Sequence, residues 1–136
     1  MPGRITLRTF IKRVERMQML ADRSDEGRCQ GLGWIPGDVR HFDSTGKTGD
    51  LPLPHMGWNQ IEHDETHPLL KGIPSGSYFY FVHSYALEVT DATLATCGYG
   101  LPFTAIVGRD NFFGAQFHPE RSGPAGARLL QNFLEL

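Results

Sequence analysis

Five short apolar runs follow one another between residues 78 and 117, and turn residues separate them. The first run is Tyr78-Phe79-Tyr80-Phe81-Val82, and the later ones occupy 87–89, 94–97, 103–107 and 112–117. Short runs of aromatic and β-branched side chains bounded by turn residues are typical of β-strands. Because the aromatic run shows no alternation with polar residues, it predicts a strand that is covered on both faces.

Two other segments repeat their apolar residues every three or four positions, which predicts amphipathic helices. The first spans residues 5–22 and ends in a polar turn near Ser24. The second spans residues 125–136, opens after Pro124, and places on one stripe Leu129, Leu130, Phe133 and Leu134. The intervening glycine- and proline-rich stretch predicts only short strands, at 39–42 and 57–61, and a helical turn at 67–70. Strands flanked by helices favour an α/β layered fold.

The composition of the 136 residues excludes several classes of protein. Thirteen Lys and Arg against fifteen Asp and Glu give a net charge of −2, whereas a duplex-DNA reader usually has a pI above about 9. No apolar run approaches the roughly 20 residues that cross a bilayer. Two cysteines, Cys29 and Cys97, are too few for a disulfide framework, which favours a reducing compartment such as the cytoplasm. The sequence suggests neither a metal nor an organic cofactor.

The strongest local candidate for chemistry is the pair His118 and Glu120, directly after the apolar run that ends at Phe117. In open α/β sheets, ligands bind beyond the carboxyl ends of the strands. A histidine there moves protons near neutral pH, and a neighbouring carboxylate orients it. A cysteine beside such a pair becomes a thiolate nucleophile. The spacing alone leaves a surface turn with two incidental polar residues equally open.

Two further histidine segments are weaker candidates. His83 follows the aromatic strand and is either a second acid/base group or a hydrogen-bonded strand-end histidine beside Ser84. His63 and His67 are four residues apart, a spacing that suits zinc on a helix. Pro68 disfavours helical backbone at His67, so this segment predicts a loop rather than a metal site.

Several longer motifs resemble the glutamine amidotransferase component of imidazole glycerol phosphate synthase, which is a class I glutamine amidotransferase. They are G-L-G-W-I-P-G at 31–37, P-H-M-G-W-N-Q at 54–60, Y-F-Y-F-V-H-S-Y at 78–85, F-F-G-A-Q-F-H-P-E-R-S-G at 112–123 and L-Q-N-F-L at 130–134. The resemblance covers residues 17–136 and implies a three-layer α/β/α fold. It makes 17–136 a partial amidotransferase domain, without its N-terminal strands and nucleophile elbow, and 1–16 an atypical basic segment.

The resemblance also implies a function. The family member hydrolyses glutamine with a Cys–His–Glu triad and passes ammonia to a cyclase, which is a (β/α)8 barrel, in histidine biosynthesis. Carried over, His118 is the base and Glu120 orients it. The glutamine-contacting positions are Gln18, Ser84 and Tyr85, and the positions facing the cyclase and the ammonia exit are His55, Met56 and Trp58. A cytoplasmic heterodimer is expected, without nucleic acid or membrane.

The sequence departs from the family where the nucleophile is expected. Family members have G-x-C-x-G-M-Q, and here Met17-Gln18 follows Val14-Glu15-Arg16, so Val14 occupies the cysteine position and Arg16 the second glycine position. Valine has no lone pair, which predicts an inactive glutaminase. Two alternatives remain: a non-catalytic cyclase-binding subunit, and a thiol hydrolase that uses Cys97.

The first sixteen residues carry five bases and one acid. A solvated helix face and an organelle transit peptide both have this composition. The change in composition at Arg16 supports a third interpretation, in which this segment comes from a shifted reading frame or a misassigned start.

Overall fold

The computed structural model describes residues 9–11, 23–24, 29–30, 38–42, 49–64, 66–109 and 112–136. Six strands form the larger sheet, in the order β1 (Thr9–Ile11), β10 (Phe112–Ala115), β9 (Pro102–Arg109), β8 (Thr93–Gly98), β5 (His55–Glu62) and β6 (Tyr78–His83). Four shorter strands form a second sheet, in the order β3 (Cys29–Gln30), β2 (Arg23–Ser24), β4 (Asp38–His41) and β7 (Tyr85–Leu87). The described helical elements are α3 (Gly123–Leu134) and the 3-10 turns η2 (Pro68–Leu70) and η3 (Pro119–Arg121).

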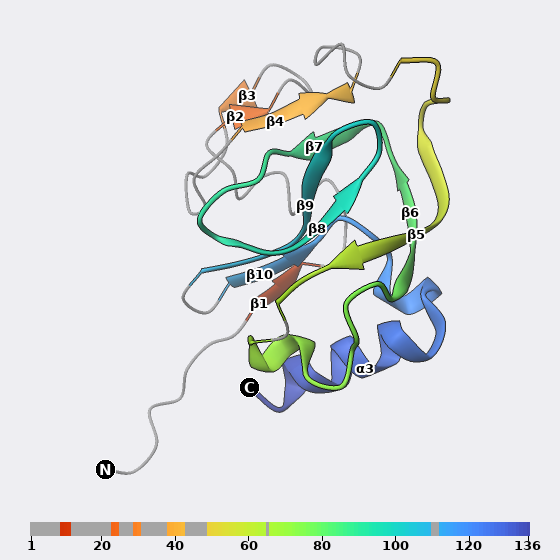
Figure 1. The fold of residues 1–136 in the computed structure, drawn as a ribbon. Helices are drawn as coiled ribbons and strands as arrows, with labels where there is room; N and C mark the ends of the chain where they lie inside the picture. The colour runs from red at the N-terminus through yellow and green to blue at the C-terminus, as the bar shows by residue number, and fades with distance from the viewer. Residues whose placement is uncertain are drawn as a thin grey trace.

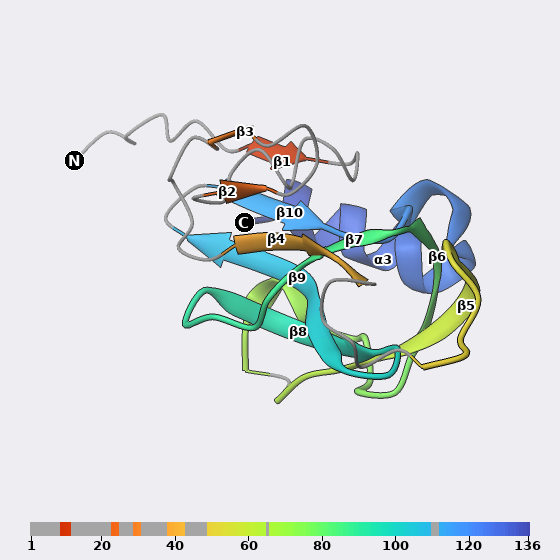
Figure 2. The ribbon, with the colours of Figure 1, turned by 90° about the horizontal axis from the view of Figure 1, so that it is seen from above.

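The described elements form a mixed α/β architecture. Helix α3 lies on one side of the six-stranded sheet and the four-stranded sheet on the other (Figure 1), so that in the view from above β2 and β4 project over β10 and β9 (Figure 2). Strand β7 of the small sheet contacts β9 of the larger one. Strands β1 and β10 pair parallel, whereas β10–β9, β9–β8, β8–β5 and β5–β6 pair antiparallel. Within the described ranges, α3 is the helix that supplies a covering layer.

Aromatic side chains fill the core beneath the strands that lead to the site. Phe79 and Phe117 lie with ring centroids 4.2 Å apart, and Phe81 meets Phe103 edge-on at 5.9 Å. All four rings are at most 1% exposed. Full burial of a phenylalanine stabilises a fold by about 1.5–3 kcal/mol. This packing therefore holds the segment after β10, where Phe117 precedes His118, against β6.

Most of the predicted elements are confirmed. Strands β6, β8, β9 and β10 occupy the predicted runs, and β4, β5, η2 and α3 also lie where the sequence indicates them. The strand expected at 87–89 lies two residues earlier, at Tyr85–Leu87. Among the described residues, no helix is long and apolar enough to span a membrane.

Three sequence interpretations are wrong. Residues 9–11 lie inside the helix predicted over 5–22, yet they form β1, because pairing with β10 satisfies their backbone groups. Ser24, assigned to a polar turn, pairs with β4 in strand β2. The aromatic strand is covered on one face only, since Tyr78 is 55% exposed and Phe79 is buried. The remainder of the predicted helix, including the proposed nucleophile position at Val14, lies outside the described residues.

The stripe predicted for α3 is also too wide. Leu129 is buried and Leu130 and Phe133 are half-buried, but Leu134 is 75% exposed. Leu134 therefore points away from the core, whereas Asn132 of the same turn is buried and Phe133 packs against the core cluster.

Candidate active site

The site is centred on the turn that follows β10. His118 ends the extended segment, and Pro119–Arg121 then form the 3-10 turn η3 that leads into α3. His118 Nδ1 lies 3.1 Å from Glu120 Oε1. A carboxylate accepts hydrogen bonds, so Nδ1 carries the proton and the lone pair of the neutral ring is on Nε2. The sequence prediction that these side chains lie together is confirmed, and their catalytic role stays a prediction.

Strand β6 holds this turn through backbone and hydroxyl hydrogen bonds. The His118 N–H donates to the Tyr80 carbonyl at 2.9 Å. Ser122, only 2% exposed, donates its hydroxyl to the His118 carbonyl at 2.6 Å and accepts from the Tyr80 N–H at 3.0 Å. Ser122 therefore joins the imidazole-bearing residue to β6. The sequence indicated Ser122 only as the start of a helix, because a contact across 42 residues leaves no local pattern.

Helix α3 packs directly on the same turn at Gly126. A Cβ at this position would lie 1.9 Å from the Pro119 carbonyl oxygen and 2.9 Å from Ser122 Cβ. Carbon and oxygen cannot approach so closely, so the backbone contact requires glycine. The residue between His118 and Glu120 is thereby held against the helix.

A buried amide lies two residues before the histidine. Gln116 is fully buried, and its Oε1 and Nε2 have no hydrogen-bond partner among the described residues. Its backbone N–H donates to the Ala105 carbonyl at 2.8 Å, so β9 holds this position. Burying an amide without a partner is destabilising, and Gln116 is therefore a costly residue close to the site.

Two imidazoles lie buried behind the turn, on the inward face of the β5–β6 hairpin. His55 and His83 are register partners, each 4% exposed, and His55 Nδ1 lies 2.8 Å from His83 Nε2. The pKa of His83 is lowered to about 3, mainly by burial and to a smaller extent by the charges of His55 and His118, against the opposing effect of the hydrogen bond to the Tyr85 carbonyl. Burial lowers the pKa of His55 to about 4. Since both nitrogens of His83 are hydrogen-bonded, the structure gives no support to a second acid/base group there.

The predicted glutamine-contacting positions follow His83. Ser84 forms the bend between β6 and β7, and its carbonyl accepts from the Phe42 N–H at 3.0 Å. Tyr85 opens β7, with its ring edge-on to His41 at 4.9 Å. Gln18, the third predicted contact, lies outside the described residues.

The predicted partner-facing positions divide between the two faces of the hairpin. Met56 is 62% exposed and Trp58 is 55% exposed. His55, predicted together with them, points inward instead, because alternate residues of a strand face opposite sides.

The cysteine alternative does not survive the structure. Cys97 is 3% exposed within the main core cluster, and burial raises the pKa of its thiol to about 12. A thiol acts as a nucleophile only as thiolate, so Cys97 is a packed core residue. The side chain of Cys29 lies outside the described residues.

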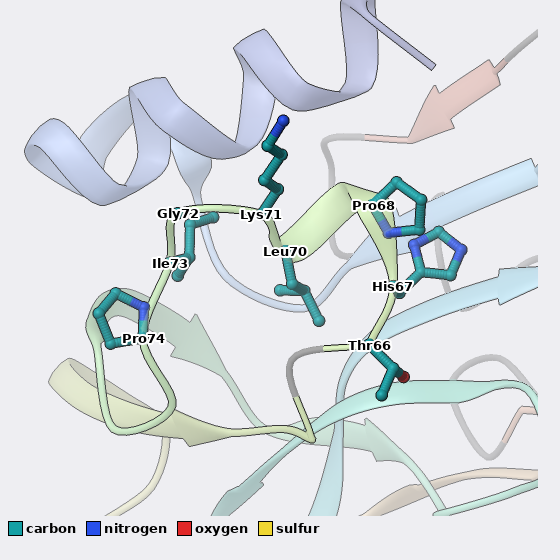
Figure 3. Close-up of a pocket in the computed structure, with 8 residues that line it drawn as sticks. All are labelled: Thr66, His67, Pro68, Leu70, Lys71, Gly72, Ile73 and Pro74. Carbon is teal, nitrogen blue, oxygen red and sulfur yellow. The ribbon is translucent and has the colours of Figure 1, made fainter.

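A separate hollow of about 550 Å³ lies at η2, where His67 contributes to its lining and His63 does not. His67 Nδ1 accepts from the Leu69 N–H at 3.1 Å, which caps the 3-10 turn and occupies one potential metal ligand. Figure 3 shows Lys71 extending toward α3 and Leu70 pointing toward the sheet. Across the described ranges, no three potential ligands cluster as a metal site would require.

The comparison with known proteins identifies the class. The family model of class-I glutamine amidotransferases matches residues 17–136, and the chain belongs to this family. It therefore has the α/β fold of that class.

The similar curated proteins bear one particular name, imidazole glycerol phosphate synthase subunit HisH. The protein of Vibrio cholerae is 51% identical over 141 residues, which cover 93% of this chain and 68% of that protein. Those of Yersinia pseudotuberculosis and Escherichia coli K12 are each 54% identical over 121 residues, covering 88% of this chain and 60% of the relative. The chain thus spans about three fifths to two thirds of the length of these relatives.

A solved structure from Thermoplasma acidophilum, assigned to a GMP synthase, resembles the described fold. The TM-score is 0.50 at 18% sequence identity, covering 60% of this chain and 43% of that one. At this identity the likeness concerns the fold alone.

Proposed function

We propose that this chain is a cytoplasmic glutamine amidotransferase subunit of imidazole glycerol phosphate synthase, working with a cyclase subunit in histidine biosynthesis. The carrying observation is the 3.1 Å contact between His118 and Glu120, at the end of a strand and with Nε2 left as the basic nitrogen. The support from relatives is the 51–54% identity to HisH subunits.

The chemistry assigned to the pair is the activation of a cysteine thiol at the nucleophile position. His118 Nε2 takes the thiol proton, and the thiolate attacks the side-chain amide carbon of glutamine. The same imidazole returns that proton to the leaving nitrogen, so that ammonia departs and a thioester remains. His118 then deprotonates water, which hydrolyses the thioester to glutamate and regenerates the thiol. Glu120 keeps the proton of the neutral ring on Nδ1 throughout.

In this chain, Val14 occupies the position of that thiol and Arg16 that of the elbow glycine. We therefore expect no glutamine turnover from the unaltered chain. The second candidate function, a cyclase-binding subunit without glutaminase activity, follows if docking is retained.

The docking surface that we propose is the outward face of the β5–β6 hairpin. Met56 lies opposite Val82, Trp58 opposite Tyr80, and Gln60 opposite Tyr78. Met56, Trp58 and Tyr78 are each more than half exposed. Arg121 lies over the Tyr80 ring at 6.0 Å, at the edge of this face. Exposed aromatic and methionine side chains with an arginine are enriched in protein interfaces.

The test mixes the chain with the cyclase and measures two quantities. Size-exclusion chromatography reports complex formation, and an enzyme-coupled assay reports glutamate release. We expect a complex and no glutamate above background. Absence of a complex contradicts the docking proposal, and glutamate release that persists in Cys97→Ser contradicts the assignment of Val14 as the missing nucleophile.

A gain-of-function variant then tests His118 directly. Val14→Cys combined with Arg16→Gly restores the residue types of the elbow, and we expect measurable glutamate release in complex with the cyclase. Adding His118→Ala is expected to return the rate to background. If the triple variant keeps the rate of the double variant, His118 is not the base.

A further inference from the structure

The buried histidines belong to a hydrogen-bonded chain that ends at the bend after β6. His83 Nδ1 lies 2.8 Å from the Tyr85 carbonyl oxygen, and His83 Nε2 lies 2.8 Å from His55 Nδ1. Asn59 Nδ2 lies 3.2 Å from His55 Nε2 and 3.0 Å from the Gly98 carbonyl. This series of hydrogen bonds therefore crosses the hairpin from Asn59 on β5 to Tyr85, the first residue of β7.

The partners determine where each proton lies. A carbonyl oxygen accepts, so His83 Nδ1 is protonated and Nε2 of the neutral ring is an acceptor. His55 Nδ1 must then donate to His83, which makes His55 Nε2 an acceptor for the Asn59 amide. Asn59 Oδ1 accepts from the Gln60 N–H at 2.8 Å, which agrees with Nδ2 as the donor. All the bonds run in one direction, from Asn59 to Tyr85.

The surroundings keep both rings neutral. His55 lies between the rings of Phe81 and Tyr99, at centroid distances of 5.0 and 4.2 Å and nearly parallel to both. A second proton on His83 would lie on Nε2 and face the Nδ1–H of His55 across the 2.8 Å contact. A second proton on His55 would lie on Nε2 and face the Asn59 amide donor across the 3.2 Å contact. Burial lowers the pKa of both histidines, as this arrangement requires.

We propose that His83, oriented by His55, is a positioning residue that holds the Ser84–Tyr85 bend in the shape that receives glutamine. This inference rests on the proposed function, which makes Ser84 and Tyr85 substrate-contacting residues. The other described contacts of the bend join it to β4 and the residue after it: the Ser84 carbonyl accepts from the Phe42 N–H, and Tyr85 pairs with His41. Two phenylalanines would fill the same space without burying polar nitrogens, so the hydrogen bond to Tyr85 is the specific contribution of this pair.

A matched pair of substitutions separates positioning from packing. In His83→Asn the amide nitrogen replaces Nδ1 and keeps a donor for the Tyr85 carbonyl. In His83→Gln the amide replaces Nε2 and keeps only the contact with His55. Both variants reduce the packing of the ring, so a comparable loss of thermal stability is expected for each.

The readouts are hydrogen exchange at the Phe42 amide, which reports the bend through Ser84, and glutamine affinity by calorimetry in the complex with the cyclase. We expect His83→Gln to lower both Phe42 protection and glutamine affinity about five- to tenfold, and His83→Asn to change each by less than about twofold. Equal effects of the two variants on Phe42 protection overturn the proposal.

The two proposals fail in different ways. One outcome is that the unaltered complex binds no glutamine while the Phe42 amide still exchanges faster in His83→Gln than in His83→Asn. In that case the substrate role of the bend is wrong, and the proposal that His83 positions the bend is retained. ¹⁵N chemical shifts of the imidazoles supply a direct check, since the chain requires Nδ1–H and bare Nε2 on both histidines at pH 7. A protonated Nε2 on His83 would contradict the hydrogen-bond directions on which the proposal rests.

Discussion

The two faces of the β5–β6 hairpin differ in almost every physical respect. The outward face presents Met56 and Trp58 to solvent. The inward face buries His55 and His83 in a directed hydrogen-bonded chain among aromatic rings. The same two strands thus combine an exposed apolar face with a packed face that supports the His118 turn. Changes inward are expected to reduce folding stability or substrate geometry, and changes outward to reduce partner affinity.

The largest loss of folding stability is expected where Gly126 of α3 packs on the Pro119 carbonyl. Gly126→Ala places a methyl group on the Pro119 carbonyl, so the turn must separate from α3, and we expect a loss of about 3 kcal/mol in the free energy of unfolding. Urea denaturation measures it. Gly98→Ala is the matched control, because a Cβ there meets nothing within 4 Å. An equal loss of unfolding free energy in Gly126→Ala and Gly98→Ala would contradict the claim that the contact at Gly126 requires glycine.

The outward face is tested by Trp58→Ala. Loss of an exposed interface aromatic is expected to weaken binding to the cyclase about 30-fold while leaving the thermal midpoint nearly unchanged. Calorimetric titration and thermal denaturation give the two values. Leu134→Ala is the control, since Leu134 is equally apolar and 75% exposed on α3. A drop in midpoint without a drop in affinity would remove the distinction between the faces.

The inward pair predicts a dependence of stability on pH. The pKa values of His55 and His83 in the fold, about 4 and about 3, lie below the value of 6.5 for an unperturbed histidine. The unfolded chain therefore binds more protons than the folded chain as the pH falls below 6.5, and folding stability decreases down to about pH 3. His83→Phe removes one such group. Between pH 6 and 4.5, we expect the unfolding free energy of this variant to fall less steeply with pH than that of the unaltered protein, by about 1.4 kcal/mol per pH unit. Parallel curves for the two proteins would show that His83 is accessible to protons.

The smallest effect concerns the buried amide near the turn. Gln116→Met replaces a fully buried amide by a side chain of similar shape, and we expect a gain of about 1 kcal/mol in unfolding free energy. Asn132→Leu is the contrasting variant, since Asn132 donates to the Leu69 and Lys71 carbonyls at 2.8 and 2.7 Å and should lose stability. A loss in Gln116→Met would reveal a partner for Gln116 elsewhere in the chain.

Local sequence patterns predicted the strands of the second half and the pair His118 and Glu120, because both depend on residues close together in the chain. The patterns were wrong for residues 9–11, where pairing with β10 decides the structure rather than the spacing of apolar side chains. They also missed Ser122 and Gly126. The roles of these residues depend on contacts with the Tyr80 backbone and the Pro119 carbonyl, which no periodicity encodes.

The aromatic strand illustrates the remaining ambiguity. A continuous run of five apolar residues is compatible with burial on two faces or with one buried and one partner-facing side. The exposure of Tyr78 distinguishes the two only once the hairpin is built. An exposed strand face can thus have the same apolar composition as a core.

Helix α3 is attached at two separate places: Gly126 to the turn of His118, and Asn132 to the carbonyls of Leu69 and Lys71 at η2. A segment tied at both positions cannot fray from one end without breaking contacts at the other. We expect its amides and those of the two 3-10 turns to exchange with solvent through a single cooperative opening, with a common free energy close to that of global unfolding. Local loosening of the histidine turn would then be rare in the native state, and its geometry would persist until the whole molecule opens.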